Sequence, residues 1–368
     1  MGKKVLVTIA FIWLFSLSAY VLSEDTTSGL NSTTAMIYSG INERYFSDGQ
    51  RFFLYAPESV LANPEEAYIL AAIHGYSGAK DDDEGIRVVE NTILRWTKLA
   101  EEFGWVVLSP HFDEGRFSSD YQRLNFSGTG VRADIRLNEL IQETERLIPG
   151  INSRKIYLFG FSGGGQFVHR YAAFHPDRII RAVAAGAGWY LWPDELFYYP
   201  VGLNMLSYQT DPNIDDLLSA NLLVLVGEDD FSDSAFRETY FIYDLSGMQG
   251  DSRRARAENW VNVLRQIAES DDIDFNIELM FAENTGHTVS PELQDIAAEY
   301  LTADSAPIAL PPWDVNKDGK TDALDLNLVG QSFGENIETP VEPNPDVNGD
   351  GTVNILDLIL VGRHFTRF

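Results

Sequence analysis

Short apolar runs alternate with segments of helical spacing across residues 38–303, and this alternation constrains the fold more than any other feature of the chain. The strand candidates are RFFLYAP, AYILAAIHG, GWVVLSP, KIYLFGFS, IIRAVAAGAG, NLLVLVGEDD and FNIELMFAE. The helical patterns between them cover residues 88–103, 132–147, 165–174, 253–267 and 291–301. Strands that are apolar on both faces and are joined by helices are typical of a parallel sheet. We therefore expect an α/β fold with a mostly parallel sheet covered by helices.

Composition divides the rest of the chain into a leader, a linker and a second module. Residues 1–23 combine two lysines, an apolar run and a small residue at Ser23, which is the pattern of a secretory signal peptide. The apolar run also approaches the length of a membrane span, but the polar segment 24–37 that follows favours cleavage and a secreted, extracellular product. Residues 304–313 are rich in proline and small residues, and we expect a linker there.

The chain carries a formal net charge of −28 and contains no cysteine. Such a surface repels nucleic acids and anionic membranes, so neither is an expected partner after the signal segment is removed. Without cysteine, thiol catalysis is excluded, and the core and bound metal have to hold an exported fold together without disulfides.

A repeated acidic segment forms the second module, residues 314–368: DVNKDGKTDALDLNLVGQSFG is followed by DVNGDGTVNILDLILVGRHF. Each copy places oxygen-bearing residues at alternate positions of a loop of about twelve residues, with glycine where the backbone turns sharply. Two matching copies, each followed by a short apolar helix, predict two calcium sites. The expected ligands are Asp314, Asn316, Asp318, Lys320, Asp322 and Asp325 in the first loop and Asp346, Asn348, Asp350, Thr352, Asn354 and Asp357 in the second. Lys320 and Thr352 contribute their backbone carbonyl groups, and the other residues contribute side-chain oxygens.

The last position of both loops is aspartate rather than the usual glutamate, and neither loop has a clear helix before it. In these respects the module resembles a type I dockerin. The resemblance implies calcium-dependent docking to a cohesin module on a scaffold or cell surface. Positions ten and eleven, often Ser-Thr in dockerins of cellulosomes, are Ala323-Leu324 and Ile355-Leu356 here. The residues therefore support calcium binding better than they support any particular partner.

The segment GFSGG, residues 160–164, lies where an expected strand turns directly into an expected helix. Such a turn strains and crowds its apex residue, and glycines on both sides of Ser162 remove the collisions. The Ser162 hydroxyl then stands exposed beside the backbone N–H of Gly163, as a nucleophile requires. An ordinary glycine-rich turn or a phosphate-binding loop gives the same short pattern, so the rest of the chain decides.

A serine nucleophile needs a base, and elimination among the six histidines leaves His287. His287 follows the last expected strand, whereas the others end strands, lie in or at the end of the helix after the serine, or belong to the second module. A carboxylate has to orient this histidine, and acidic residues follow the strand NLLVLV. We assign that role to Asp230, with Asp233 as the main rival, because a side chain at Asp230 can turn back toward the histidine loop.

A second backbone donor for the oxyanion is expected after the strand beside the serine strand, in the segment IHGYSG. The N–H of Tyr76 is then the natural partner of the N–H of Gly163, and His74 shapes the turn. The aromatic stretch GWYLWPDELFYYP follows another strand end, where substrates bind in such sheets. Three roles remain open for Trp189, Tyr190 and Trp192 of this stretch: they could line a substrate pocket, form part of a cap or pack in the core.

Four short segments together resemble the α/β hydrolase superfamily, in particular extracellular esterases related to polyhydroxybutyrate depolymerases and feruloyl esterases. They are His74-Gly75, residues 160–164 with Gln166, residues 227–230 and Gly286-His287. The resemblance covers residues 38–303. It implies an α/β-hydrolase fold that hydrolyses a carboxylic ester, small or polymeric, through an acyl-serine intermediate and without a catalytic cofactor. A peptidase of the same fold remains an alternative, because the same groups cleave amides. A non-catalytic binding protein is a third, which the retained serine, histidine and acidic loop disfavour.

Overall fold

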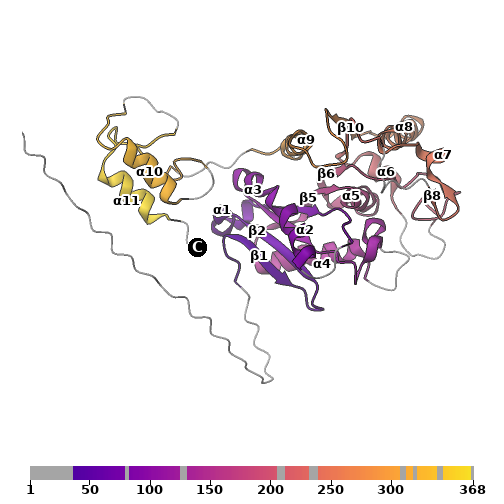
Figure 1. Ribbon diagram of the computed structural model, residues 1–368, viewed down its shortest axis with the longest axis horizontal. Coiled ribbons are helices and arrows are strands. Elements are labelled where there is room, and N and C mark those ends of the chain that lie inside the picture. Colours follow the sequence, from indigo (N-terminus) through magenta and orange to yellow (C-terminus); the bar gives the residue numbers. More distant parts are fainter. Residues whose placement is uncertain are drawn as a thin grey trace, which may run out of the picture. The chain divides into compact units, whose positions relative to one another are not determined.

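The computed structural model (Figure 1) describes residues 36–78, 83–124, 131–204, 212–231, 239–306, 312–317, 321–337 and 343–365. The predicted signal segment, half of the predicted linker, Asp233, Asp318 and Lys320 lie outside these ranges. No helix within them is both long enough and apolar enough to cross a membrane.

One eight-stranded sheet has the strand order β1-β2-β4-β3-β5-β6-β7-β10. Its strands are β1 (Gly40–Tyr45), β2 (Arg51–Ala56), β3 (Tyr68–Ile73), β4 (Trp105–Pro110), β5 (Asn152–Phe161), β6 (Ile179–Ala185), β7 (Leu222–Gly227) and β10 (Ile277–Ala282). β2 pairs antiparallel with β1 and β4, whereas the other neighbours are parallel. The mostly parallel sheet predicted from the sequence is confirmed. β1 is additional: its sequence GINERY is polar because it forms a partly exposed edge.

Helices cover both faces of this sheet (Figure 1). Leu158 of β5 packs in a core with side chains of α4, α5 and α8, whereas its neighbour Phe159 packs on the other face with side chains of α2, α3 and α9. The helices of this domain are α1 (Glu58–Ala62), α2 (Asp83–Leu94), α3 (Thr97–Phe103), α4 (Ala133–Leu147), α5 (Gly163–Phe174), α6 (Ile214–Leu218), α7 (Leu245–Gln249), α8 (Arg253–Asp271) and α9 (Pro291–Thr302). Short elements complete it: η1 (Pro64–Glu66), η2 (Ser118–Arg123), η3 (Pro176–Arg178), and the hairpin of β8 (Thr239–Tyr240) and β9 (Tyr243–Asp244).

The single helix expected over residues 88–103 is divided into α2 and α3. Trp96, between the two helices, is fully buried, and its ring lies 4.6 Å from the ring of Phe159. The intervening segment ILRWTKL contains neither glycine nor proline. The break is therefore associated with burial of the indole against the sheet rather than with a local breaking residue.

The second module contains the two helices expected after the acidic loops, α10 (Ala323–Gln331) and α11 (Ile355–Arg363). Each begins with a capping box, formed by Asp322 and Asp325 in α10 and by Asn354 and Asp357 in α11. Its small core consists of Val315, Val329, Val347, Val353 and Val361. Trp313 and His364, far apart in the module's sequence, stack with ring centroids 3.7 Å apart.

Gly165→Ala tests how closely α5 approaches β6. A Cβ at Gly165 would collide with the backbone carbonyl of Ala185, whereas a Cβ at Gly188 would meet only ordinary contact distances. We expect Gly165→Ala to lower the free energy of unfolding by about 1–3 kcal/mol or more. Gly188→Ala is the control and should change it by less than about 0.5 kcal/mol. Denaturant unfolding of both variants measures this; equal stability of the two would contradict the close packing.

Candidate active site

Ser162 occupies the apex of the turn between β5 and α5. Its backbone has φ 56° and ψ −111°, a strained conformation for a residue other than glycine. The Ser162 N–H donates to the carbonyl of Ala185 at 2.8 Å, and its own carbonyl accepts from the N–H of Gln166 at 3.0 Å. These bonds tie the turn to β6 on one side and to the first turn of α5 on the other.

The glycines around Ser162 are required by close backbone approaches. A Cβ at Gly164 would collide with the carbonyl oxygen of Ile73, and a Cβ at Gly160 would collide with that of Gly164. The helix can therefore begin directly against the end of β3 only because these residues have no side chains. This is the physical basis of the sequence pattern.

Ser162, His287 and Asp230 form a continuous hydrogen-bonded chain. Ser162 Oγ lies 3.0 Å from His287 Nε2, and Nδ1 of the same ring lies 2.7 Å from Asp230 Oδ2. The ring therefore donates from Nδ1 to the carboxylate and can accept the serine proton at Nε2. Along the chain, Ser162 follows β5, Asp230 follows β7 and His287 follows β10. The parallel strands therefore bring together side chains from distant parts of the sequence. Asp230 is buried, whereas Asp229 and Glu228 are exposed.

Packing contacts hold the His287 ring in place in addition to its hydrogen bonds. The Phe161 ring lies 4.9 Å from it, measured between centroids. Gly186, with φ +55°, passes close by, because a Cβ at that position would lie 3.4 Å from the imidazole Cε1. These contacts fix the ring between the sheet edge and the serine.

Arg253 completes the surroundings of Asp230, and the sequence analysis did not identify it. Its Nη1 lies 3.0 Å from Asp230 Oδ1, and both side chains are almost completely buried. Arg253 is the first residue of α8, directly after the capping residue Ser252. Only its position at a helix start is visible in the sequence, and nothing there indicates that it faces a carboxylate on another element.

His74 and His169 lie near the site but have both ring nitrogens committed. Burial lowers the pKa of His74 to about 4; its Nδ1 donates to Gly75 and its Nε2 accepts from the Phe112 N–H. Burial, followed by the charge of Arg170, holds the pKa of His169 well below its usual range. Its Nδ1 and Nε2 bond to backbone groups of Gly165 and Leu191. Both rings are therefore neutral parts of the scaffold.

The backbone segment of Tyr76, where the sequence predicts a second oxyanion donor, runs beside Gly163. A Cβ at Gly163 would lie 2.8 Å from the Tyr76 nitrogen and 2.7 Å from the Tyr121 hydroxyl. Tyr121 donates to the carbonyl of His74 at 3.1 Å, which supports the turn before Tyr76. The backbone nitrogen of Tyr76 therefore lies close to Gly163, the residue that follows the serine.

The three aromatic residues considered for a substrate pocket have different environments. Trp189 and Tyr190 are 2% and 0% exposed, and Tyr190 stacks on Trp260 with centroids 4.7 Å apart. Trp189 packs against Tyr240 and against the Arg170 guanidinium. Trp192 is partly buried. Burial of Trp189 and Tyr190 favours packing in the core over contact with a substrate.

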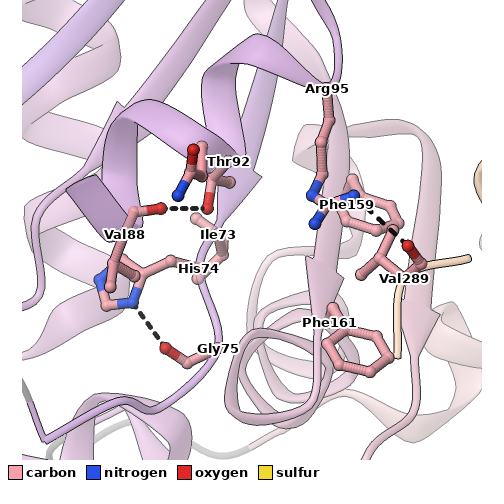
Figure 2. Close-up of a pocket in the computed structure, with 10 residues that line it drawn as sticks. Ile73, His74, Gly75, Val88, Thr92, Arg95, Phe159, Phe161 and Val289 are labelled. Carbon is pink, nitrogen blue, oxygen red and sulfur yellow. Dashed lines mark hydrogen bonds between the residues drawn. The ribbon is translucent and has the colours of Figure 1, made fainter. Parts of the chain in front are cut away.

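Residues next to the serine turn line a cavity of about 250 Å³ (Figure 2). Gly75 of the Tyr76 segment and Phe161, the residue before Ser162, both contribute to its wall. The remaining lining residues come from the ends of β3 and β5, from α2 and from the loop after His287: Ile73, His74, Val88, Asn91, Thr92, Arg95, Phe159 and Val289. The sequence analysis did not identify this cavity, because its walls come from four separate segments.

The described residues of the acidic loops in the second module offer oxygen atoms as metal ligands. In the second loop, Asp346 accepts from the N–H groups of Asp350 and Gly351, and Asp357 accepts from those of Asn348 and Asn354. Within the described ranges, no three histidine or acidic side chains gather as a metal site would require. The donor chemistry nevertheless fits calcium, which prefers carboxylate, amide and carbonyl oxygens.

Comparison with known proteins separates the two parts of the chain. A family model described as "Dockerin type I domain" matches residues 312–366. No curated protein matches the sequence.

Two solved structures share the fold of the larger part. Poly(aspartic acid) hydrolase-1 from Sphingomonas sp. KT-1 is 24% identical with a TM-score of 0.60, covering 72% of this chain and 98% of its own. The poly(3-hydroxybutyrate) depolymerase LpqC from Bordetella parapertussis is 20% identical with a TM-score of 0.58, covering 74% of this chain and 92% of its own. The predicted dockerin resemblance is confirmed by the family match, and the predicted fold by these structures. The chain therefore combines an α/β-hydrolase fold with a type I dockerin domain at residues 312–366.

Proposed function

We propose that the larger domain is a serine hydrolase of carboxylic esters. The observation that carries this proposal is the continuous chain from Ser162 through His287 to Asp230. Its order in the sequence, serine then acid then histidine, is that of the α/β hydrolases. The strained backbone at Ser162 also supports the proposal, because strain of this kind concentrates at functional sites.

In the proposed reaction, Ser162 Oγ attacks the ester carbonyl carbon while His287 Nε2 accepts the hydroxyl proton. The N–H groups of Gly163 and Tyr76 donate to the oxyanion that forms. The alkoxide leaves with the proton from His287, and an acyl group remains on Ser162. Water then adds to that acyl group with His287 as the base, which releases the carboxylic acid and restores the serine.

Amide hydrolysis is the second candidate, because the same groups cleave amides. The two similar structures are named for hydrolysis of poly(aspartic acid) and of poly(3-hydroxybutyrate), which are joined by amide and ester bonds respectively. We favour esters because an alkoxide is a better leaving group than the nitrogen of an amide, so an ester places the smaller demand on the same groups. Turnover of matched ester and amide substrates by the same preparation distinguishes the two.

We also propose that the enzyme is secreted and that its dockerin domain binds calcium at two sites and docks to a cohesin-type partner. The leader-like residues 1–23 and the negative charge support export. The exposed apolar side chains of Leu324, Ile355 and Leu356 support a protein partner.

Ser162→Ala should abolish ester hydrolysis without unfolding the protein. The hydroxyl is the attacking group, and turnover should fall by about a million-fold. Steady-state kinetics with 4-nitrophenyl esters, together with circular dichroism of the same preparation, checks this. A fluorophosphonate probe should label the native chain and not the variant. If the variant retains more than about 1% of activity, Ser162 is not the nucleophile.

Removal of calcium should unfold the dockerin domain of the intact chain and leave the hydrolase domain folded. Asp346, Asp350 and Asp357 place negative charges in one short loop, and so small a domain cannot offset their repulsion by burial. Calorimetry should show one transition that disappears with a chelator and returns with calcium. Ester turnover should stay within about twofold in both states. A calorimetric trace insensitive to calcium would contradict this expectation.

A further inference from the structure

The cavity next to the serine turn combines apolar side chains with polar groups contributed by α2 and the residue after it. Ile73, Phe159, Phe161 and Val289 contribute apolar surface. The cavity wall lies close to the serine, because a Cβ built on the lining residue Gly75 would lie 3.6 Å from Ser162 Cβ. About 250 Å³ is sufficient for a short chain or a single ring.

Some of the polar groups at the cavity already use their hydrogen-bonding capacity within the protein, and others can still bond to a ligand. Both nitrogens of His74 are bonded to the backbone, and the Thr92 hydroxyl donates to the carbonyl of Val88. Arg95 makes a single long contact, 3.4 Å from Nη1 to the carbonyl of Val289, and no ion pair among the described residues. Figure 2 shows its side chain extending from the end of α2 toward Phe159 and Val289.

We propose that this cavity binds an apolar substituent of the ester substrate that ends in a carboxylate, which pairs with Arg95. This assignment rests on the proposed ester hydrolysis. A guanidinium can form two parallel hydrogen bonds with a carboxylate, a geometry that suits a group arriving from the apolar side. The chain is strongly acidic overall, so a cation at this position opposes the repulsion that an anionic substrate otherwise meets.

The test compares 4-nitrophenyl valerate with the 4-nitrophenyl monoester of glutarate, whose acyl chains differ by a terminal methyl or carboxylate. We expect Arg95→Met to lower kcat/KM for the glutarate ester about tenfold and to change that for valerate by less than about twofold. Arg87→Met is the matched control: Arg87 is exposed on α2 and does not line the cavity. It should leave the preference unchanged.

A second arm moves the carboxylate to the leaving group, with 4-acetoxybenzoate against 4-methylphenyl acetate. An Arg95-dependent preference in this arm assigns the cavity to the alcohol part of the substrate, and one in the first arm assigns it to the acyl part. If Arg95→Met changes neither preference, or Arg87→Met changes them equally, the proposal is overturned. If native protein hydrolyses no ester at all, the proposed function itself fails.

The burial of Arg253 against Asp230 supports a second, independent inference. Asp230 Oδ2 faces His287 and Oδ1 faces Arg253, so each oxygen has its own partner and the carboxylate plane is fixed. Tyr190 also lies near this pair; burial, followed by Asp230, raises its pKa well above the usual range. An unpaired buried carboxylate is costly, and it would turn or recruit water to be solvated.

We infer that Arg253 is a positioning residue that acts on the reaction through Asp230. If so, removing the arginine matters only while the carboxylate is present. Arg253→Met should lower kcat by about 10-fold to 100-fold, with KM within about twofold. In the Asp230→Asn background, which is already impaired, the same change should cost less than about threefold. The double variant should also be more stable than Arg253→Met, because it no longer buries an unpaired charge.

Arg256→Met is the control for loss of a buried arginine from the same helix. Arg256 is fully buried on α8 and donates to the carbonyls of Gly188 and Gly250. We expect it to lower the melting temperature while kcat stays within about threefold. Arg253→Lys, which keeps the charge, should recover most of the turnover. Equal losses from Arg253→Met in both backgrounds, or an equal loss of kcat from Arg256→Met, would overturn the positioning role.

Discussion

The architecture of the larger domain depends on how closely the first turn of α5 approaches the ends of β3 and β6. Gly164 and Gly165 place helix backbone directly against the carbonyls of Ile73 and Ala185. This approach leaves Ser162 no relaxed backbone conformation, and it sets the hydroxyl above the sheet edge where loops from other strands converge. The Tyr76 backbone beside Gly163, the imidazole and the cavity are all positioned relative to that turn.

Much of this arrangement could be predicted because it depends on local rules. A strand that turns directly into a helix needs glycines, and parallel strands deliver the loops after β3, β5, β7 and β10 to one edge. These rules are sufficient to place Ser162, His287 and Asp230 near one another. They are also sufficient for the acidic repeat, where ligand positions follow from the loop itself.

Other features depend on packing between segments that the sequence does not connect. Arg253 faces Asp230 only because α8 starts beside the end of β7, and a helix-start arginine more often faces solvent. The division between α2 and α3 is associated with the burial of Trp96. Trp189 and Tyr190 follow a strand end, as residues lining a pocket would, but the chain folds them inward onto α5 and α8. Their apolar character alone could not distinguish the two outcomes.

The capping boxes of the dockerin domain couple two events that are usually separate. Starting a helix is costly because several residues are fixed before the first intrahelical bond forms. In α10 and α11 the cap residues Asp322 and Asn354 accept the first N–H groups of the helix. Asp325 and Asp357, in the first turns, accept from the N–H of the cap residue and also from loop N–H groups, those of Asn316 and Asn348. Each loop therefore serves as the nucleus of its own helix. Conditions that order a loop lower the initiation barrier of the helix that follows it, so each loop and its helix form as one cooperative unit.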